Sequence, residues 1–170
     1  MSKIKFLVFT LLVISIFSSC DKVPADEQNI LLQEWVGPFG GVPAFDKMKL
    51  EDVKPAILEG MQLQLEDIDA ITNNEETPTF ENTIVELELA GAELNRAFSY
   101  YGILSGNMSS PEFREIQGEL SPILAEFQSK VIQNEKLFAR IKTVYDAAKK
   151  NPLDSEEQRV VELTYKKFEM

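Results

Sequence analysis

Apolar residues recur at helical spacing from about residue 51 almost to the end of the chain. Over residues 51–73 the intervals between them are four, four, four, three and three, which places them on one face of an α-helix. No strand-like alternation stands out, and the segments between the helical runs are short. The sequence therefore predicts an all-α fold of antiparallel helices. The first helix would bury Val53, Ile57, Met61, Leu65, Ile68 and Ile71.

A second helix is predicted to start within the stretch TPTFENTIVELE, residues 77–88. Pro78 disfavours helical backbone at the residue before it, and Thr79 is a good N-cap. Glu81 complements the positive end of the helix dipole, while Asn82 stands where a capping-box side chain reaches back to the cap. Because each of these residues has a structural role, we interpret the stretch as a helix start and not as a reactive site.

The apolar stripe of this second helix is expected to continue without interruption to residue 101. Its intervals alternate between four and three residues, as in packed antiparallel helices. Gly91 falls on the stripe, and a helical glycine costs roughly 0.5–1 kcal/mol relative to alanine. We therefore expect another helix to approach closely at Gly91. The stripe consists of Phe80, Ile84, Leu87, Gly91, Leu94, Phe98 and Tyr101.

Three more helices are predicted in the remaining sequence. The third starts at SSPE, residues 109–112, where a serine caps and the proline suits the first turn. Pro122 lies inside this helix and should kink it or split it in two. A fourth covers about residues 133–151, and the last opens with Asp154 as cap and Glu157 at capping-box spacing. The apolar residues are Phe113, Ile116, Leu120, Leu124, Phe127 and Val131 in the third helix and Leu137, Phe138, Ile141 and Tyr145 in the fourth.

Residues 31–52 interrupt the helical pattern with a cluster of glycine and proline, GPFGGVP. Such a segment cannot form a regular helix. We expect an extended but ordered loop that is held in place by Trp35, Phe39 and Phe45. No Lys-Ser or Lys-Thr pair follows the glycines, so the segment is not a phosphate-binding loop.

The N-terminus has the pattern of a secretory signal. A short basic region precedes residues 6–17, an apolar run of 12 residues that is too short to span a membrane. Cys20, the only cysteine, follows two serines and has no partner for a disulfide within the chain. This arrangement resembles the lipobox of bacterial lipoproteins, in which the cysteine is acylated and becomes the mature N-terminus. The alternatives are ordinary signal cleavage nearby with a free thiol, or an uncleaved N-terminal anchor.

On the lipoprotein interpretation, residues 1–19 are a signal peptide, 20–30 a polar tether and 31–170 a helical domain. The expected location is the bacterial cell envelope, on the periplasmic side or at the outer membrane. Membrane lipid would then be a partner, through acylated Cys20. The net charge of −11 disfavours nucleic acid as a partner.

The side chains exclude several kinds of catalytic site. The chain has no histidine, which excludes a histidine general base, Ser-His or Cys-His nucleophilic pairs and the HExxH zinc motif. The carboxylates of Glu66, Asp67 and Asp69 lie within a helical period, between apolar residues, and are interpreted as a solvated face. We therefore expect no catalytic residue and no metal ligand in this sequence.

Two motifs connect the chain to a known family. The stretches LLQEWVGPFGGVPAFDKMKLEDVKPAILEGM and IDAITNNEETPTFENTIVELELAGAELNRAF resemble the N-terminal region of bacterial peptidyl-dipeptidases, in the thimet oligopeptidase and oligopeptidase A family of zinc metallopeptidases. Later segments resemble the following parts of that region, in the same order. The motif residues are Trp35, Gly37, Pro38, Gly40, Gly41, Pro43, Phe45 and Asp46 in the first stretch and Pro78, Phe80, Glu81, Asn82 and Thr83 in the second.

The resemblance implies a mostly helical N-terminal region followed by a catalytic region that holds zinc through HExxH and a downstream glutamate. The two regions of such enzymes border a deep channel that admits short peptides, and peptidyl-dipeptidases release dipeptides from the C-terminus. No catalytic or zinc-binding residue can be assigned here, because this sequence has none of those positions. No cofactor is expected in this chain, although the full-length family uses zinc.

We therefore expect an N-terminal fragment of a lipid-anchored peptidase that forms one wall of the channel and is inactive alone. Short peptides would be partners only through the missing catalytic domain. The last helix has no glycine cap or polar tail, as expected for a domain cut within a helix, although a frayed terminal helix would have the same pattern. The alternative is a standalone, lipid-anchored helical scaffold that binds a partner.

Overall fold

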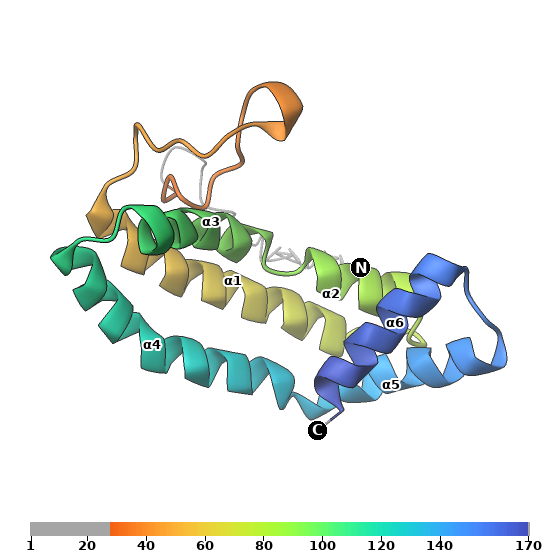
Figure 1. Cartoon of the computed structure of the whole chain (residues 1–170). Helices are drawn as coiled ribbons and strands as arrows, with labels where there is room; N and C mark the ends of the chain where they lie inside the picture. Colours follow the sequence, from red (N-terminus) through yellow and green to blue (C-terminus); the bar gives the residue numbers. More distant parts are fainter. Residues whose placement is uncertain (1–27, 170) are drawn as a thin grey trace, which may run out of the picture.

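The computed structural model describes residues 28–169, and all their regular elements are helical, which confirms the all-α class (Figure 1). The predicted signal peptide and Cys20 lie outside these residues. Two short 3₁₀ turns precede the first long helix. The elements are η1 Pro38–Gly40, η2 Leu50–Asp52, α1 Val53–Thr72, the π-helical turn η3 Phe80–Val85, α2 Glu86–Leu89, α3 Ala92–Asn107, α4 Pro111–Ile132, α5 Glu135–Lys150 and α6 Ser155–Phe168.

The later helices begin where the sequence predicts, because polar side chains cap them. The Ser110 hydroxyl accepts a hydrogen bond from the Phe113 N–H at 3.1 Å, at the start of α4. The Asn134 side chain caps α5, and the Asp154 carboxylate accepts from two backbone N–H groups at the start of α6. These caps satisfy backbone donors that have no partner within the helix, and so fix the short connections between helices.

Helices α1 and α3 pack closely against each other, and a glycine permits the close approach. A Cβ atom built on Gly60 of α1 would lie 2.9 Å from the Cα of Leu94 in α3. That distance is too short for a side chain at position 60 without movement of the backbone of α3. Gly60 thus sets the spacing between these two helices.

The prediction of one continuous second helix was wrong. The turn η3 and the short α2 end at Leu89, and α3 begins only at Ala92. Gly91 between them has φ +77°, in the left-handed region that glycine adopts readily, so the helix cannot run through it. The glycine is required by this backbone conformation and not, as predicted, by a close helix crossing: a Cβ there would meet only the flexible Gln64 side chain of α1, at 2.6 Å, whereas the close backbone approach lies at Gly60.

Pro122 does not split the third predicted helix. Helix α4 runs unbroken from Pro111 to Ile132 with Pro122 inside it. The proline removes one backbone donor, which leaves the turn before it without one of its hydrogen bonds. Within α4 only Phe113 and Leu120 are buried, while residues of its C-terminal half, such as Phe127 and Val131, are partly buried and pack against the core clusters.

The described residues form two separate core clusters. The first lies between α1, α3 and α4 and includes Ile57, Tyr100 and Phe113. The second lies between the C-terminal end of α1, η3, α5 and α6 and includes Ile84 and Ile141. Within residues 28–169 no helix is both long enough and apolar enough to cross a membrane.

Candidate functional site

The first sequence motif forms a loop that is attached to α3 at one end and projects from the body at the other (Figure 1). The Phe45 ring lies 5.0 Å from the Tyr100 ring, and the Ala44 N–H donates a hydrogen bond to the Tyr100 hydroxyl at 2.8 Å. The predicted role of Phe45 is therefore confirmed. Trp35 is half-buried, whereas the Val36 and Val42 side chains are exposed. The side chain of Phe39 lies outside what the structure describes.

The glycines and prolines of this loop determine its backbone path. Gly37, Gly40 and Gly41 all have positive φ angles, of 121°, 84° and 84°. A Cβ on Gly41 would lie 2.5 Å from the carbonyl carbon of Trp35, so only glycine lets the two ends of the loop approach. The other motif residues of the loop are Pro38, which starts η1, Pro43, whose carbonyl accepts from the Phe45 N–H, and Asp46, which is exposed.

The second sequence motif forms the predicted helix cap. The Asn82 N–H donates to the Thr79 hydroxyl at 3.1 Å, and the Thr79 N–H donates to the Asn82 side-chain oxygen at 2.8 Å. This is a reciprocal capping box with an amide in place of the usual glutamate. Hydrogen bonds from the backbone and from Thr79 hold the pKa of Glu81 below its ordinary value, as expected for a carboxylate in a first helical turn.

The remaining residues of this motif lie in the second core cluster or beside it. Thr83 is fully buried, and its hydroxyl donates to the Asn82 side-chain oxygen at 2.9 Å. Phe80 is partly buried and packs against the cluster, and Pro78, just before the cap, is also partly buried. The stretch is therefore a helix start, as predicted.

Sequence analysis missed the residue that connects this cap to the rest of the domain, Arg140 of α5. One guanidinium nitrogen donates to the Asn82 side-chain oxygen at 3.0 Å, and the other donates to the carbonyls of Asn74 and Glu76 at 2.7 and 3.3 Å. The arginine is 7% exposed. A signal was available, because Arg140 lies three residues after Leu137 and so on the apolar face of its helix.

The structure does not bring the two motifs together. The loop motif packs on the first core cluster, and the capping motif packs on the second, at the other end of the domain (Figure 1). Neither motif contributes to a catalytic arrangement. Their shared property is that each fixes the path of the backbone between two packed elements.

The described residues do not fit a zinc ion. Across residues 28–169 no three His, Cys, Asp or Glu side chains are grouped so that they could hold a metal. The predicted solvated face is confirmed for Glu66, Asp67 and Asp69, all exposed on α1, although Asp67 also accepts a hydrogen bond from the Gly91 N–H at 3.0 Å. Residues 28–169 contain no histidine and no cysteine, and so lack the nitrogen and sulfur ligands that zinc prefers.

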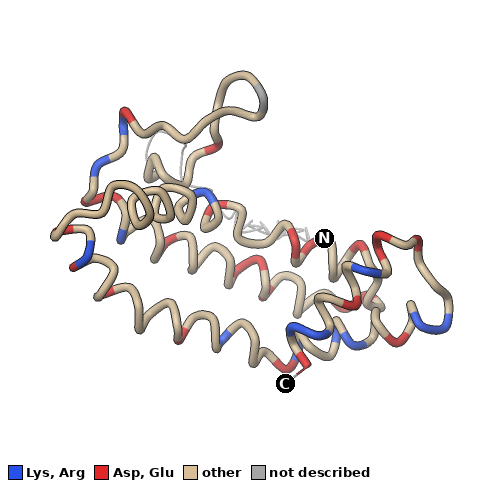
Figure 2. Tube along the Cα trace, viewed as in Figure 1, with Lys and Arg blue, Asp and Glu red and all other residues tan. Residues whose placement is uncertain are grey.

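Charge is unevenly distributed over the fold. Figure 2 shows acidic residues along α1 and α2, whereas lysines and arginines alternate with acidic residues on α5 and α6. On that side the Tyr145 and Tyr165 rings stack at 3.9 Å, and the Lys149 ammonium lies 4.0 Å from the centre of the Tyr145 ring. The two C-terminal helices are thus held together by aromatic packing and by a cation–π contact.

Comparison with known proteins gives consistent matches. Residues 54–170 match the N-terminal domain of neurolysin and thimet oligopeptidase. The dipeptidyl carboxypeptidase of Escherichia coli K12 is 34% identical over 126 residues, which cover 74% of this chain and 18% of that enzyme. The dipeptidyl carboxypeptidase of Salmonella typhimurium LT2 is 31% identical over 140 residues, and oligopeptidase A of E. coli K12 is 26% identical over 129 residues.

The alignments cover 82% and 76% of this chain for the last two relatives, and 20% and 19% of those enzymes. The chain thus spans about a fifth of the length of the curated relatives it matches. The family match extends over most of the helical part of the structure, from α1 to α6. The chain therefore belongs to the neurolysin and thimet oligopeptidase family, in which it corresponds to the N-terminal domain.

Proposed function

We propose that this chain is the N-terminal helical part of a lipid-anchored zinc metallopeptidase, a peptidyl-dipeptidase that releases C-terminal dipeptides from short peptides. The observation that carries the proposal is the match of residues 54–170 to the family's N-terminal domain, together with relatives that are named dipeptidyl carboxypeptidases. In this role the helices form one wall of the peptide channel and take no part in bond cleavage.

The composition supports a chain that is inactive by itself. It contains no histidine, and its described residues do not fit a zinc site. Zinc and the groups that cleave the peptide bond would have to come from another part of the whole protein. Exposed apolar side chains, such as Val36 on the loop, Leu89 on α2 and Leu163 on α6, are suited to contact with that part.

The proposed location is the bacterial cell envelope, with the chain attached to a membrane through acylated Cys20. Support comes from the N-terminal sequence, where a basic and then apolar stretch precedes the chain's only cysteine. Growth with labelled palmitate tests the attachment. The label should enter the wild-type chain and be absent from the Cys20→Ser variant.

A lipid-anchored scaffold that binds a partner is the second candidate. It is favoured by the two core clusters, which bury side chains such as Tyr100 and Leu137 completely. A chain with such cores would melt cooperatively as a monomer, whereas a domain separated from its mate would aggregate or bind a hydrophobic dye.

Peptide hydrolysis by the purified 170-residue chain tests the first candidate. Mass spectrometry would follow dipeptide release from an N-terminally blocked peptide, with the E. coli dipeptidyl carboxypeptidase as positive control. We expect no release by this chain, with or without added zinc, because it lacks the ligands and the general base. Dipeptide release that EDTA abolishes would show that the chain is an enzyme in its own right.

A further inference from the structure

Two of the chain's four tyrosines form a stacked pair between the last two helices. The rings of Tyr145 in α5 and Tyr165 in α6 have centres 3.9 Å apart and planes only 6° from parallel. Aromatic pairs more often lie offset or edge to face, with centres about 4.5–7 Å apart. The printed ring contacts of the other two, Tyr100 and Tyr101, are with phenylalanines. Within residues 28–169, the stacked pair is therefore the place where two phenol rings face each other.

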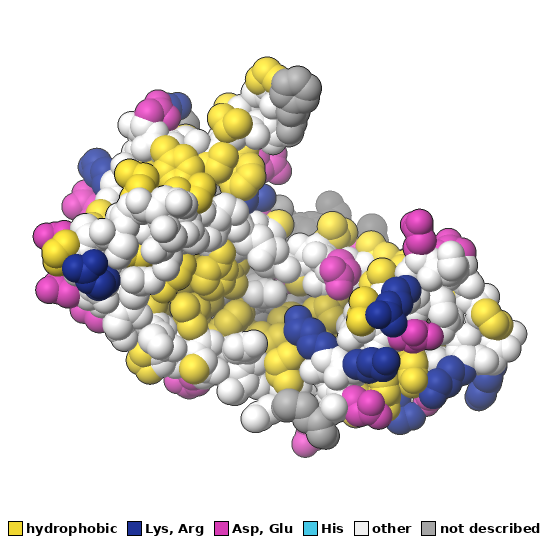
Figure 3. Space-filling model, in the orientation of Figure 1, with side chains coloured by type: hydrophobic (Ala, Val, Ile, Leu, Met, Phe, Trp, Pro, Cys, Tyr) yellow, Lys and Arg dark blue, Asp and Glu magenta, His cyan; other side chains and the backbone are white. Residues whose placement is uncertain are grey.

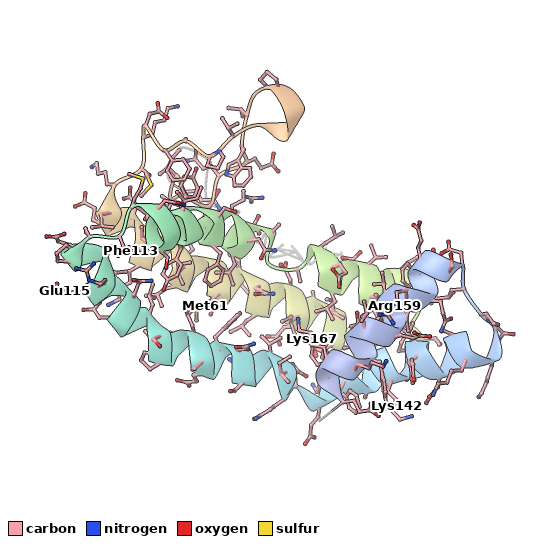
Figure 4. All side chains as sticks on the ribbon, viewed as in Figure 1. Met61, Phe113, Glu115, Lys142, Arg159 and Lys167 are labelled. Atoms are coloured by element: carbon pink, nitrogen blue, oxygen red, sulfur yellow. The ribbon has the colours of Figure 1, made fainter. Side chains whose placement is uncertain are left out.

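Neighbouring side chains of α5 pack around the pair. The Phe138 ring lies 5.8 Å from the Tyr165 ring, and the Lys149 ammonium lies 4.0 Å from the centre of the Tyr145 ring. Figure 4 shows Lys142 on α5, close to where α6 crosses that helix. Because the two helices share a core, their rings stay together, and a reaction between them gains the rate advantage of a fixed short distance.

The pair is also within reach of solvent. Tyr145 and Tyr165 are both partly exposed, whereas Tyr100 is fully buried. Figure 3 shows hydrophobic side chains, a class that includes tyrosine in that view, at the surface over α5 and α6 between charged side chains. A one-electron oxidant in solution can therefore take an electron from either ring while the domain stays folded.

The Tyr165 hydroxyl has a proton acceptor in place. It donates a hydrogen bond to the Glu169 carboxylate at 3.0 Å, and this bond raises the pKa of Tyr165. The phenol is therefore neutral at neutral pH and must release its proton when it loses an electron, and the carboxylate can take that proton directly. At Tyr145 the nearby Lys149 ammonium repels a second positive charge, so the proton leaves to solvent together with the electron.

We propose that Tyr145 and Tyr165 are a site of oxidative cross-linking, at which a dityrosine joins α5 to α6. Each phenol loses one electron and one proton, which gives two neighbouring tyrosyl radicals. The radicals join through a carbon–carbon bond between ring carbons ortho to the hydroxyls. The hydrogens on those carbons then move to the oxygens, which restores both aromatic rings. Hydrogen peroxide, acting through a haem peroxidase, accepts the two electrons and two protons and becomes two molecules of water.

The cross-link fixes α6 to the rest of the domain. The new bond closes a loop made of the end of α5, residues 151–154 and the start of α6. Closing such a loop restricts the unfolded chain more than the folded one, so the cross-linked protein should unfold at a temperature about 5–10 °C higher. Differential scanning calorimetry measures this shift. An unchanged or lower unfolding temperature would overturn the role of the link in fixing α6.

Peroxidase treatment of the purified full chain tests the proposal. The dilute protein is treated with a haem peroxidase and a limiting amount of hydrogen peroxide, and the products are followed by mass spectrometry and by the blue fluorescence of dityrosine. We expect a monomer that is lighter by two hydrogen atoms, in which Tyr145 and Tyr165 are the linked residues. Cross-links only between chains, or a link that includes Tyr100 or Tyr101, would overturn the proposal.

Phenylalanine variants are matched controls, because each removes one hydroxyl and keeps the ring. Tyr145→Phe and Tyr165→Phe should each abolish the link within the chain, whereas Tyr101→Phe should retain it. In urea, where the rings no longer meet, the yield of the link should fall by about tenfold or more. A link that forms equally well in the unfolded chain would overturn the assignment to the stacked pair, because it would depend only on closeness in sequence.

Glu169→Gln tests the proton acceptor. The amide oxygen can still accept the hydrogen bond from Tyr165 but cannot take its proton, so the link should form about tenfold more slowly. Glu126→Gln removes the same charge at an exposed position on α4 and should leave the rate unchanged. Equal rates for the two variants would overturn the role of Glu169.

Discussion

Replacing Arg140 with methionine should lower the free energy of unfolding by about 2–3 kcal/mol. The buried guanidinium donates hydrogen bonds to the Asn74 and Glu76 carbonyls and to the Asn82 side-chain oxygen. Methionine keeps roughly the volume of the side chain but removes the donors to the Asn74 and Glu76 carbonyls, while the Asn82 oxygen keeps only its bonds from the Thr79 N–H and the Thr83 hydroxyl. Urea unfolding, followed by far-UV circular dichroism, would measure the loss.

Arg159→Met is the matched control for this change. Arg159 lies on α6, its side chain is 61% exposed, and its guanidinium lies 3.7 Å from the Glu162 carboxylate. An exposed ion pair of this kind contributes little, so the control should change stability by less than about 0.5 kcal/mol. If Arg140→Met and Arg159→Met had equal effects, the account of Arg140 as the link between α5 and the turn after α1 would be wrong.

Replacing Phe113 with alanine should cost about 3–5 kcal/mol, because the ring is fully buried and its removal leaves a cavity. The ring lies 5.3 Å from the Tyr101 ring of α3. Phe113 and Leu120 are the buried residues of α4, so the change should also loosen that helix. Hydrogen exchange of α4 amides should accelerate more than exchange in α5, which belongs to the other cluster.

Phe127→Ala provides the comparison within the same helix. Phe127 is only partly buried and lines a pocket between α3, α4 and α6, so its removal should destabilise the fold clearly less than the removal of Phe113. If the two substitutions had equal effects on unfolding, α4 would be packed equally along its whole length. The structure, in which the C-terminal half of α4 borders this pocket, would then be contradicted.

The parts of the fold that depend on local sequence were predicted well. Helix starts follow from side chains within four residues of the cap, and the Thr79–Asn82 capping box is present as expected. The apolar face of α1 was also predicted, because five of its six expected residues are buried and Leu65 is partly buried. In both cases the determining interactions lie within one or two helical turns.

The parts that depend on tertiary contacts were not predicted. The spacing of apolar residues continues through Gly91, so periodicity alone could not reveal that its backbone leaves the helical region there. The close contact at Gly60 requires knowing that Leu94 lies opposite it. Arg140 was missed for a similar reason, since its acceptors are 58 to 66 residues away in the sequence.

The candidate sites also divide into features that local sequence determines and features that depend on tertiary contacts. The loop and capping motifs were correctly interpreted as structural, because glycine, proline and cap chemistry act locally. The pocket of about 260 Å³ between α3, α4 and α6 could not be predicted, since its lining residues come from helices that are far apart in the sequence.

The central claim is that this chain serves as the N-terminal wall of a peptidyl-dipeptidase, and a segment exchange tests it most directly. The matching segment of the E. coli dipeptidyl carboxypeptidase would be replaced by residues 54–168 of this chain. The measurement is EDTA-sensitive release of C-terminal dipeptides. The account predicts that the exchanged enzyme retains activity within about tenfold, while an enzyme without the segment loses it. An exchanged enzyme that folds and binds zinc but has no activity would contradict the claim. Full activity of the enzyme that lacks the segment would also contradict it.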